Sequence, residues 1–387
     1  MNFNMDRFIT PLSEHSQHLL NTPRTEQSMY IKTLENTMFS SNESEQRILR
    51  SQQSPLFKLR DLKRPIDSDI KSPPPPRIGG IVRKLDAPGV NEDYYSHLMD
   101  CTVGNHLAVG LIDRVFIKND HAIQSHKCDS LVISVAWHES GMFLAVSTGT
   151  GVFVMDAPTD KKICHISDIP SVAFPMDWAR DTLWVGTKIG WVVCVDVRTR
   201  DGPLGFNRFD DRVCGLKVSP SKTMIACGGN DGMVKVLDVR KDCRVLTTFK
   251  HKNAGVKALD WCPWRHNTLA SGGGHEDRNL KIWDVNIGSC LKSIETNAQI
   301  TGVKWSLESR ELATSHGYPT PMILTWNYDN LSKGSAYREH KSKIVSLSRF
   351  PNNNLASLST DESLIQWDLF EKPRTIKRDN PFEFVIR

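Results

Sequence analysis

Short apolar runs separated by polar turns fill most of this chain. In one representative unit, apolar and β-branched residues dominate positions 213–218, 224–227 and 233–237, while turn-forming residues occupy 219–222 and 229–232. Runs of this length bounded by Gly, Asn, Pro or Ser are typical of β-strands joined by tight turns. The unit therefore predicts a small antiparallel sheet.

The same unit returns along the chain with a regular ending. Further copies span residues 133–156, 172–196, 256–284, 300–327 and 344–368, and an earlier, degenerate copy spans 98–118. Six copies end in an apolar residue followed by Asp or Asn, at Met155-Asp156, Val195-Asp196, Leu237-Asp238, Trp283-Asp284, Trp326-Asn327 and Trp367-Asp368. Successive endings are 40, 42, 46, 43 and 41 residues apart. This is the period of a propeller blade, so the sequence predicts an all-β fold, a seven-bladed WD-repeat β-propeller.

A closed ring must also cover the edges of its first and last blades. Propellers usually achieve this by letting a strand from one end of the chain complete a blade begun at the other. We expect residues 81–85 to pair beside the last blade in this way. The ten tryptophans all lie from Trp137 onward, and core packing within the blades is their simplest interpretation.

Composition divides the chain into three regions. Residues 1–80 lack a sustained helical or alternating pattern, are rich in Ser, Thr, Asn, Gln and Glu, and close with four prolines at 73–76. Such a segment is predicted to be a disordered tail. Residues 81–370 form the predicted propeller, and residues 371–387 form a short C-terminal tail.

Charge and cysteine usage exclude several classes of function. The formal net charge of +5 is small for 387 residues, and no basic stripe indicates a nucleic-acid partner. No apolar stretch approaches a membrane span, and the nine cysteines are scattered without a C-x-x-C pair. We therefore expect a soluble protein of the nucleus and cytoplasm, with reduced thiols, no cofactor, no metal and no membrane partner.

Motifs that would indicate an enzyme are missing from the sequence. It contains no G-x-x-x-x-G-K-[ST], no H-E-x-x-H and no G-x-S-x-G. The polar cluster at 275–278, His-Glu-Asp-Arg, is expected to face solvent at a turn, because neighbours in sequence cannot all converge on one ion. The sequence thus favours a binding protein over a catalyst.

Several stretches are more specific than the repeat itself. They lie at residues 85–88, 91–95, 105–111, 228–231, 256–263, 272–274, 277–278 and 315–318. In this order they resemble the propeller of the Fizzy and Fizzy-related proteins, which are co-activators of the anaphase-promoting complex, a ubiquitin ligase. The resemblance covers about residues 81–370. It implies that the chain recognises degradation signals on substrates and promotes their ubiquitin-dependent proteolysis in mitosis or meiosis.

Both ends of the chain carry motifs similar to the family's ligase-docking signals. Asp6, Arg7, Phe8 and Ile9 resemble the start of the C-box, although the family's following Pro and final Arg are missing. Ile386-Arg387 resembles the family's terminal Ile-Arg, which is captured through its carboxylate, guanidinium and apolar side chain. Two modest contacts on one chain raise avidity without either being strong.

The resemblance assigns two degron sites on the propeller. Asp86 and Glu362 match the acidic pair that binds the Arg of the destruction box, R-x-x-L, and ring closure is expected to bring them together. Without the resemblance, Asp86 would be interpreted as a turn residue and Glu362 as a solvated hairpin charge. A second signal, Lys-Glu-Asn, is expected on one face of the ring. The matching positions are Asp93, Tyr94, Asn230, His275 and Lys343, with Gly232 in place of the family's Asn.

These positions do not all keep the family residue. His275 and Lys343 replace a Thr and an Arg, and Lys343 loses the two-pronged geometry that a guanidinium offers to a carboxylate. We therefore expect weaker or altered reading of Lys-Glu-Asn, and the departures from the mitotic pattern suggest a meiosis-specific member.

The resemblance also implies a set of partners. These are subunits of the anaphase-promoting complex, substrates such as cyclins and securin, and a spindle-checkpoint protein bound through Arg47, Ile48 and Leu49. The same three residues are equally consistent with an amphipathic segment that docks on the ligase. The alternative interpretation is a WD-repeat scaffold that joins a complex without presenting substrates.

Overall fold

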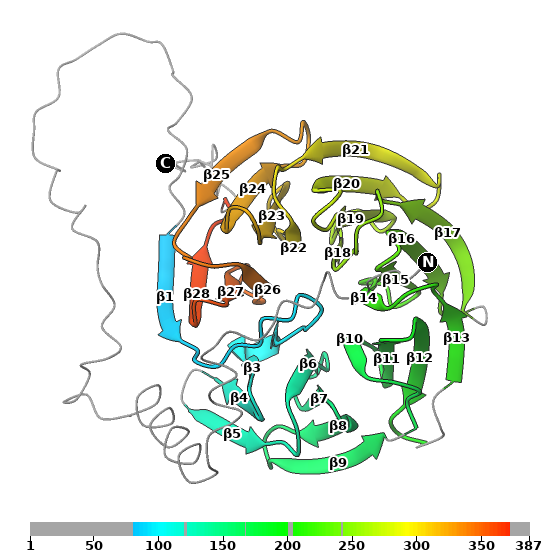
Figure 1. Cartoon of the computed structure of the whole chain (residues 1–387), viewed down its shortest axis with the longest axis vertical. Helices are drawn as coiled ribbons and strands as arrows, with labels where there is room; N and C mark the ends of the chain where they lie inside the picture. The colour runs from blue at the N-terminus through cyan, green and yellow to red at the C-terminus, as the bar shows by residue number, and fades with distance from the viewer. Residues whose placement is uncertain (1–79, 120–121, 167, 200–203, 241–242, 372–387) are drawn as a thin grey trace, which may run out of the picture.

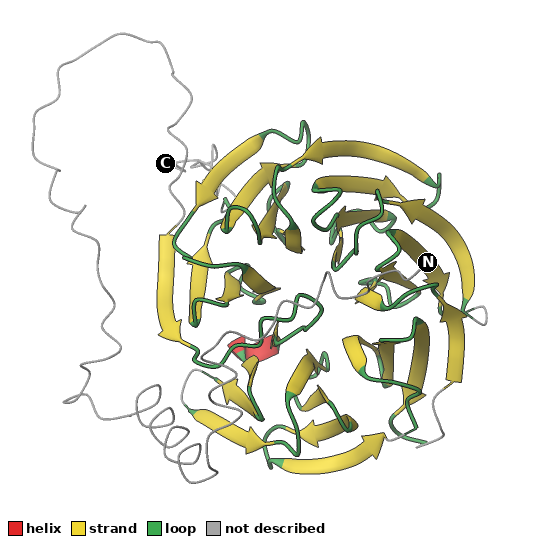
Figure 2. Cartoon of the chain, in the orientation of Figure 1, coloured by secondary structure: helices red, strands yellow, loops and turns green. Residues whose placement is uncertain are grey.

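A closed ring of seven antiparallel sheets forms the body of the protein (Figure 1). The computed structural model describes residues 80–371 except 120–121, 167, 200–203 and 241–242. Each sheet has four strands and forms one blade, so the predicted seven-bladed, all-β propeller is confirmed. Figure 2 shows strands and loops almost throughout, with one 3-10 turn at Val103–Asn105.

The strands follow the chain order blade by blade. The first blade contains β2 (Met99–Cys101), β3 (Leu107–Leu111), β4 (Arg114–Lys118) and β5 (Ile123–Lys127). The second contains β6 (Val132–Trp137), β7 (Phe143–Thr148), β8 (Gly151–Asp156) and β9 (Lys161–Ile166), and the third contains β10 (Ala173–Ala179), β11 (Thr182–Thr187), β12 (Trp191–Asp196) and β13 (Leu204–Arg208). The fourth contains β14 (Val213–Val218), β15 (Met224–Gly229), β16 (Met233–Asp238) and β17 (Arg244–Lys250).

The remaining three blades complete the ring. The fifth contains β18 (Ala258–Trp261), β19 (Thr268–Gly272), β20 (Asn279–Asp284) and β21 (Ser289–Glu295). The sixth contains β22 (Ile300–Trp305), β23 (Glu311–His316), β24 (Met322–Asn327) and β25 (Lys333–Tyr337). The seventh contains β26 (Ile344–Arg349), β27 (Leu355–Ser359) and β28 (Ser363–Asp368), with β1 (Gly80–Asp86) as its outer strand.

Strand β1 closes the ring as predicted. It pairs antiparallel with β28, with Ile81 opposite Trp367 and Leu85 opposite Leu364. The first strand of the described chain thus completes the last blade, and the chain then enters the first blade. This pairing covers the edge of β28, so β28 is not left as an exposed edge strand.

The six repeated endings also have a structural explanation. Each is the end of the third strand of its blade, on β8, β12, β16, β20, β24 and β28. The carboxylate of Asp284 accepts a hydrogen bond from the backbone N–H of Asn286 at 2.9 Å, and Asp196, Asp238 and Asn327 accept the equivalent bond two residues on. An Asp or Asn side chain that bonds in this way starts a tight turn, so the ending marks where the strand must reverse.

The fourth, outer strand of each blade was not predicted from the sequence. The repeat unit predicted three strands, whereas each blade has four. In β17 only Phe249 is buried, and β21 has no buried residue. An exposed strand lacks the apolar run that a buried strand shows, so its pattern is hard to distinguish from a loop.

Apolar side chains fill the spaces between neighbouring blades. Eight of the ten tryptophans are buried, and Trp191 and Trp264 are partly buried against the core, which confirms the packing interpretation. Trp305 stands between blades five and six, with its ring 5.6 Å from Trp264 and 5.5 Å from Tyr328 between centroids. Such aromatic contacts add to the stabilisation from burial alone.

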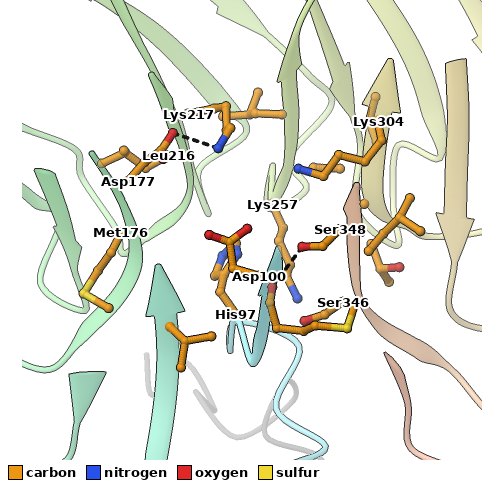
Figure 3. Close-up of a pocket in the computed structure, with 18 residues that line it drawn as sticks. His97, Asp100, Met176, Asp177, Leu216, Lys217, Lys257, Lys304, Ser346 and Ser348 are labelled. Carbon is orange, nitrogen blue, oxygen red and sulfur yellow. Dashed lines mark hydrogen bonds and ion pairs between the residues drawn. The ribbon is translucent and has the colours of Figure 1, made fainter. Parts of the chain in front are cut away.

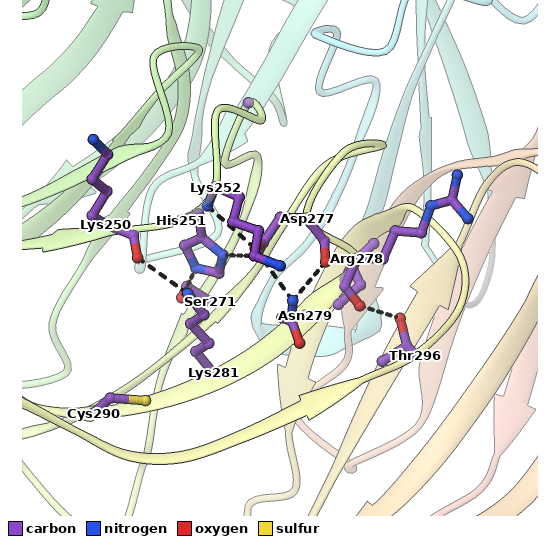
Figure 4. Close-up of polar contacts among 12 residues, drawn as sticks. Lys250, His251, Lys252, Ser271, Asp277, Arg278, Asn279, Lys281, Cys290 and Thr296 are labelled. Atoms are coloured by element: carbon purple, nitrogen blue, oxygen red, sulfur yellow. Dashed lines mark hydrogen bonds and ion pairs between the residues drawn. The ribbon is translucent and has the colours of Figure 1, made fainter.

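A buried polar chain runs through the fifth blade (Figure 4). His251 Nδ1 lies 2.5 Å from Asp277 Oδ2, and its Nε2 lies 2.7 Å from Ser271 Oγ, which accepts the indole N–H of Trp283 at 2.6 Å. The expectation that the 275–278 cluster faces solvent is therefore wrong for Asp277, which is 4% exposed. Burial raises its pKa, but the bonds from His251 outweigh burial and hold the pKa at about 2.

Membrane-spanning helices and clustered metal ligands are both absent from the described residues. No helix in this part of the chain is long and apolar enough to cross a membrane. The same residues contain no group of three or more His, Cys, Asp or Glu side chains that could hold a metal ion. All nine cysteines are free thiols.

Candidate functional site: a groove at the ring closure and the mouth of the channel

Ring closure places the two predicted destruction-box carboxylates on adjacent strands. Asp86 ends β1 opposite Ser363, the residue that follows Glu362 and begins β28. The backbone carbonyl of Glu362 accepts a hydrogen bond from Ala87 N at 2.7 Å. The predicted proximity of Asp86 and Glu362 is thus observed, although the two residues are far apart in sequence.

Glu362 is held in an unusual conformation. Its φ of 61° lies in the left-handed region, and its Oε1 accepts the N–H of Gly89 at 3.0 Å. Asp86 is exposed, and its carboxylate makes no hydrogen bond to any described residue. One carboxylate is therefore fixed by the backbone, while the other is open to a cation from solvent.

A cavity with a mixed polar and apolar lining lies between the last and first blades, on the strands whose ends carry these carboxylates. Its volume is about 230 Å³. It is lined by Val82, Leu85, Asn105, Leu107, Lys118, Phe350, Asn352, Asn354, Leu364 and Gln366. We call this cavity together with Asp86 and Glu362 the closure groove. Sequence reasoning missed this cavity, because the lining residues come from both ends of the propeller and share no local pattern.

The second predicted site surrounds the opening of the central channel. The segment that links β1 to β2 reaches over this opening (Figure 1). The hydroxyl of Tyr94 lies 3.4 Å from Gly255 O, in the loop that leads into blade five, and 3.3 Å from Ile300 O of blade six. Tyr95 donates its hydroxyl to Asn230 Oδ1 at 2.9 Å. The two tyrosines therefore tie the segment across the ring.

The remaining predicted residues lie around the same opening. The Asp93 carboxylate accepts the N–H of Tyr95 at 3.0 Å. Burial lowers the pKa of Lys343, and the nearby carboxylates of Glu92 and Asp93 oppose that shift. The loop of blade six that carries Gly317 lies beside Lys343 of blade seven, because a Cβ placed on Gly317 would be 3.7 Å from Lys343 Cβ. We call Asp93, Tyr94, Asn230, His275 and Lys343 the channel mouth.

Gly232 contributes backbone only. Its φ is 80°, and a Cβ there would lie 2.9 Å from the carbonyl oxygen of His251. Any side chain would be strained at this position. The family's Asn has no equivalent here, so recognition at the mouth depends on the other residues.

A charged lining inside the channel supports the mouth from below (Figure 3). Lys257 donates to Ser96 O at 2.8 Å and to Val345 O at 2.5 Å, and its ammonium lies 5.5 Å from the ring of Tyr94. Burial lowers the pKa of Lys257 to about 7. Lys217 forms an ion pair with Asp177 at 2.9 Å. These residues were not predicted from the sequence, although a charged residue within an apolar run could have indicated a charged channel lining.

The remaining predicted sites cannot be placed. Asp6, Arg7, Phe8, Ile9, Ile386 and Arg387 lie outside the described residues, as do Arg47, Ile48 and Leu49. Their roles stay predictions.

Comparison with known proteins gives this architecture a family. The family model of the CDC20/Fizzy WD40 domain matches residues 85–367. The chain belongs to the CDC20/Fizzy family. The resemblance on which the sequence analysis relied is thereby confirmed, and the match begins and ends within a few residues of the strands that close the ring.

Individual relatives agree with this membership. The chain is 32% identical over 317 residues to "Cell division cycle 20.5, cofactor of APC complex" of Arabidopsis thaliana, covering 76% of this chain and 70% of the relative. It is 30% identical to "Protein FIZZY-RELATED 1" of the same plant, covering 82% and 70%, and 31% identical to "WD repeat-containing protein slp1" of Schizosaccharomyces pombe, covering 77% and 63%.

A solved structure shares the fold. A chain of "Crystal Structure of Mitotic Checkpoint Complex" superposes with a TM-score of 0.73 at 29% identity, covering 80% of this chain and 100% of that one. This chain therefore has the same fold as a chain of that complex.

Proposed function

We propose that this CDC20/Fizzy protein is a non-enzymatic co-activator of the anaphase-promoting complex that binds degrons on its propeller. The support comes from relatives named as cofactors of that complex and from the closure groove. Its partners are subunits of the ligase and substrates such as cyclins and securin. It acts in the nucleus and cytoplasm, and its departures from the mitotic pattern favour a role in meiosis.

The single observation that carries the proposal is that ring closure brings two carboxylates together where the last and first blades meet, with a cavity between the same two blades. Asp86 and Glu362 offer negative charge to an arginine, and charge-assisted bonds to a guanidinium are among the stronger polar contacts. The cavity beside Leu85 and Leu364 offers space for a leucine. This combination matches the Arg and Leu of a destruction box, R-x-x-L.

Ubiquitination of a fluorescent destruction-box substrate tests the proposal. Purified ligase is assayed with the full-length chain, and initial rates are compared between wild type and Asp86→Ala plus Glu362→Ala. We expect the double variant to lose stimulation roughly thirty- to a hundred-and-fiftyfold, since each lost carboxylate removes a bond of about 1 to 1.5 kcal/mol. Glu308→Ala plus Glu339→Ala, which removes two exposed carboxylates elsewhere, serves as the matched control.

A further variant separates recognition from folding. Glu362→Gly relieves the left-handed backbone but removes the carboxylate, so we expect stimulation to fall while thermal stability stays within about 1 kcal/mol of wild type. Absence of stimulation by the wild-type chain, or stimulation that the double variant leaves intact, would refute substrate presentation through this groove.

The second candidate function is a scaffold that joins the complex without presenting substrates. It is favoured by His275 and Lys343, which depart from the family's residues at the channel mouth. A chain that co-purifies with the ligase yet leaves the ubiquitination rate unchanged would establish this alternative.

A further inference from the structure

An exposed aromatic pair stands at the edge of the channel mouth. Tyr318 is 65% exposed, the most exposed aromatic side chain among the described residues. Its ring stacks on His275, with ring centroids 5.9 Å apart and planes inclined by 26°. The two residues come from the loops of neighbouring blades, five and six. Core packing explains most aromatic side chains of this ring, but it does not explain Tyr318.

The backbone holds both members of the pair in place. The carbonyl of Tyr318 accepts the N–H of Gln299 at 3.1 Å, and Gly317 N–H donates to Gln299 O at 2.9 Å. The carbonyl of His275 accepts Arg278 Nε at 2.7 Å. The pair is therefore a preorganised surface, and a ligand that stacks on it has little ordering cost to overcome.

The pair is continuous with the channel mouth. Gln299 precedes Ile300, whose carbonyl lies 3.3 Å from the Tyr94 hydroxyl. Gly274, which precedes His275, packs against Gly255, the other carbonyl neighbour of that hydroxyl. A peptide seated on Asp93, Tyr94 and Lys343 would thus reach Tyr318 with an adjoining residue.

The surrounding charges select the kind of side chain that fits. Arg278 lies 3.5 Å from His275 Nε2, and Lys343 lies on the neighbouring loop, so a cationic side chain would be repelled. Glu276, 3.2 Å from His275 Nδ1, disfavours an acidic one. A neutral flat ring avoids both costs and gains from stacking.

We propose that His275 and Tyr318 form a stacking platform for an aromatic side chain that flanks the Lys-Glu-Asn signal of a substrate. This inference rests on the proposed function, because it extends the degron site at the channel mouth. It makes this chain selective for a subset of Lys-Glu-Asn peptides. Lys343 stands where the family has Arg, so the Lys-Glu-Asn signal itself is expected to bind less tightly. The added contact between the flanking aromatic side chain and the platform would offset this loss.

Peptide binding to the full-length chain tests the platform. Fluorescence polarisation is measured with Lys-Glu-Asn peptides that carry Phe or Ala at each of the two positions before and after the signal. We expect Phe at one of these positions to tighten binding about two- to tenfold over Ala, the range of measured aromatic pairs. Tyr318→Ala should abolish this preference without changing the affinity of the all-Ala peptide.

Two further variants distinguish stacking from general stickiness. Ile287→Ala removes a 73% exposed apolar side chain elsewhere on the ring and should leave the preference intact. Tyr318→Leu keeps an apolar side chain without a flat ring and should lose most of the preference.

The outcomes also separate this inference from the function on which it rests. Tight but equal binding of the Phe and Ala peptides would overturn the platform and leave the degron site standing. Binding of no Lys-Glu-Asn peptide, while the destruction-box substrate is still ubiquitinated, would overturn both the mouth site and the platform but not the co-activator role.

Discussion

The closure groove and the channel mouth recognise ligands, in our proposal, by opposite structural means. The groove is made where the two ends of the propeller meet, and Asp86 there is exposed without a hydrogen-bond partner among the described residues. The mouth is made of groups that are already hydrogen-bonded within the protein: Tyr94 to backbone carbonyls across the channel, and Asn230 to the hydroxyl of Tyr95. One site is open and depends on ring closure, whereas the other is rigid and depends on a buried network.

This difference shows what determines the binding affinity at each site. At the groove, a ligand replaces water around solvated charges, so affinity is set by contacts to the ligand. At the mouth, the ligand meets a preorganised surface, so its affinity depends on residues that never touch it. Lys257 is the main one, since it supports the segment carrying Tyr94 from inside the channel.

The largest expected effect comes from removing β1. A chain beginning at Gly80 should unfold cooperatively like the full chain, whereas a chain beginning at Ala87 should lose several kcal/mol, because the strand's hydrogen bonds to β28 contribute about 1 kcal/mol each. Chemical denaturation of the two truncations measures this difference. Equal midpoints would show that the groove does not depend on ring closure.

A smaller effect, confined to the mouth, is expected from Lys257→Met. The substitution leaves the carbonyls of Ser96 and Val345 unpaired, which should cost about 2 to 4 kcal/mol and weaken Lys-Glu-Asn binding. Destruction-box binding should change little once the protein is kept below its melting temperature. Lys333→Met, on an exposed outer strand, is the matched control.

The pH dependence of folding stability gives a second test of the Lys257→Met variant. Its pKa of about 7 in the folded protein lies below the ordinary value, so the unfolded chain binds more protons between pH 7 and about 10. Wild-type stability should therefore gain from this residue as pH rises through that window, and Lys257→Met should lose the gain. An unchanged pH profile would contradict the buried cation.

The smallest expected effect is a loss of stability at acidic pH that differs between the two regions. Burial lowers the pKa of His316 to about 4, so between pH 6.5 and 4 the unfolded chain binds more protons and stability falls as pH falls. The expected loss from this residue is about 2 kcal/mol at pH 5. The His316→Gln variant should lose less stability on acidification.

Hydrogen exchange at pH 5 locates this loss. Amides of β23, which leads into the loop of Tyr318, should lose protection before those of β28 beside the groove. At β28, hydrogen bonds from His340 and Ser363 outweigh burial and keep the pKa of Asp361 well below its ordinary value. Simultaneous exchange in both strands would contradict this order.

Much of the fold followed from local pattern. The six endings predicted the third strand of six blades, since Asp or Asn at a strand end starts a turn wherever it occurs. The outer strands were missed because solvated strands carry no apolar signature. Asp277 was misplaced because its neighbours look like an exposed turn, and only packing against His251 shows that it is buried.

The candidate sites were predictable to different degrees. The pairing of Asp86 with Glu362 was expected from closure together with the family resemblance. The cavity, the support from Lys257 and the stack on Tyr318 were not, because each joins residues of separate blades.

The sequence alone determined the repeat, the number of blades and the strand that closes the ring, because these depend on patterns within about forty residues. Only the tertiary structure decided which charges are buried and satisfied, and which side chains meet. The bond between Gly89 and Glu362 joins residues 273 positions apart. No local pattern encodes such a contact, since it exists only when all seven blades have packed and the ring has closed.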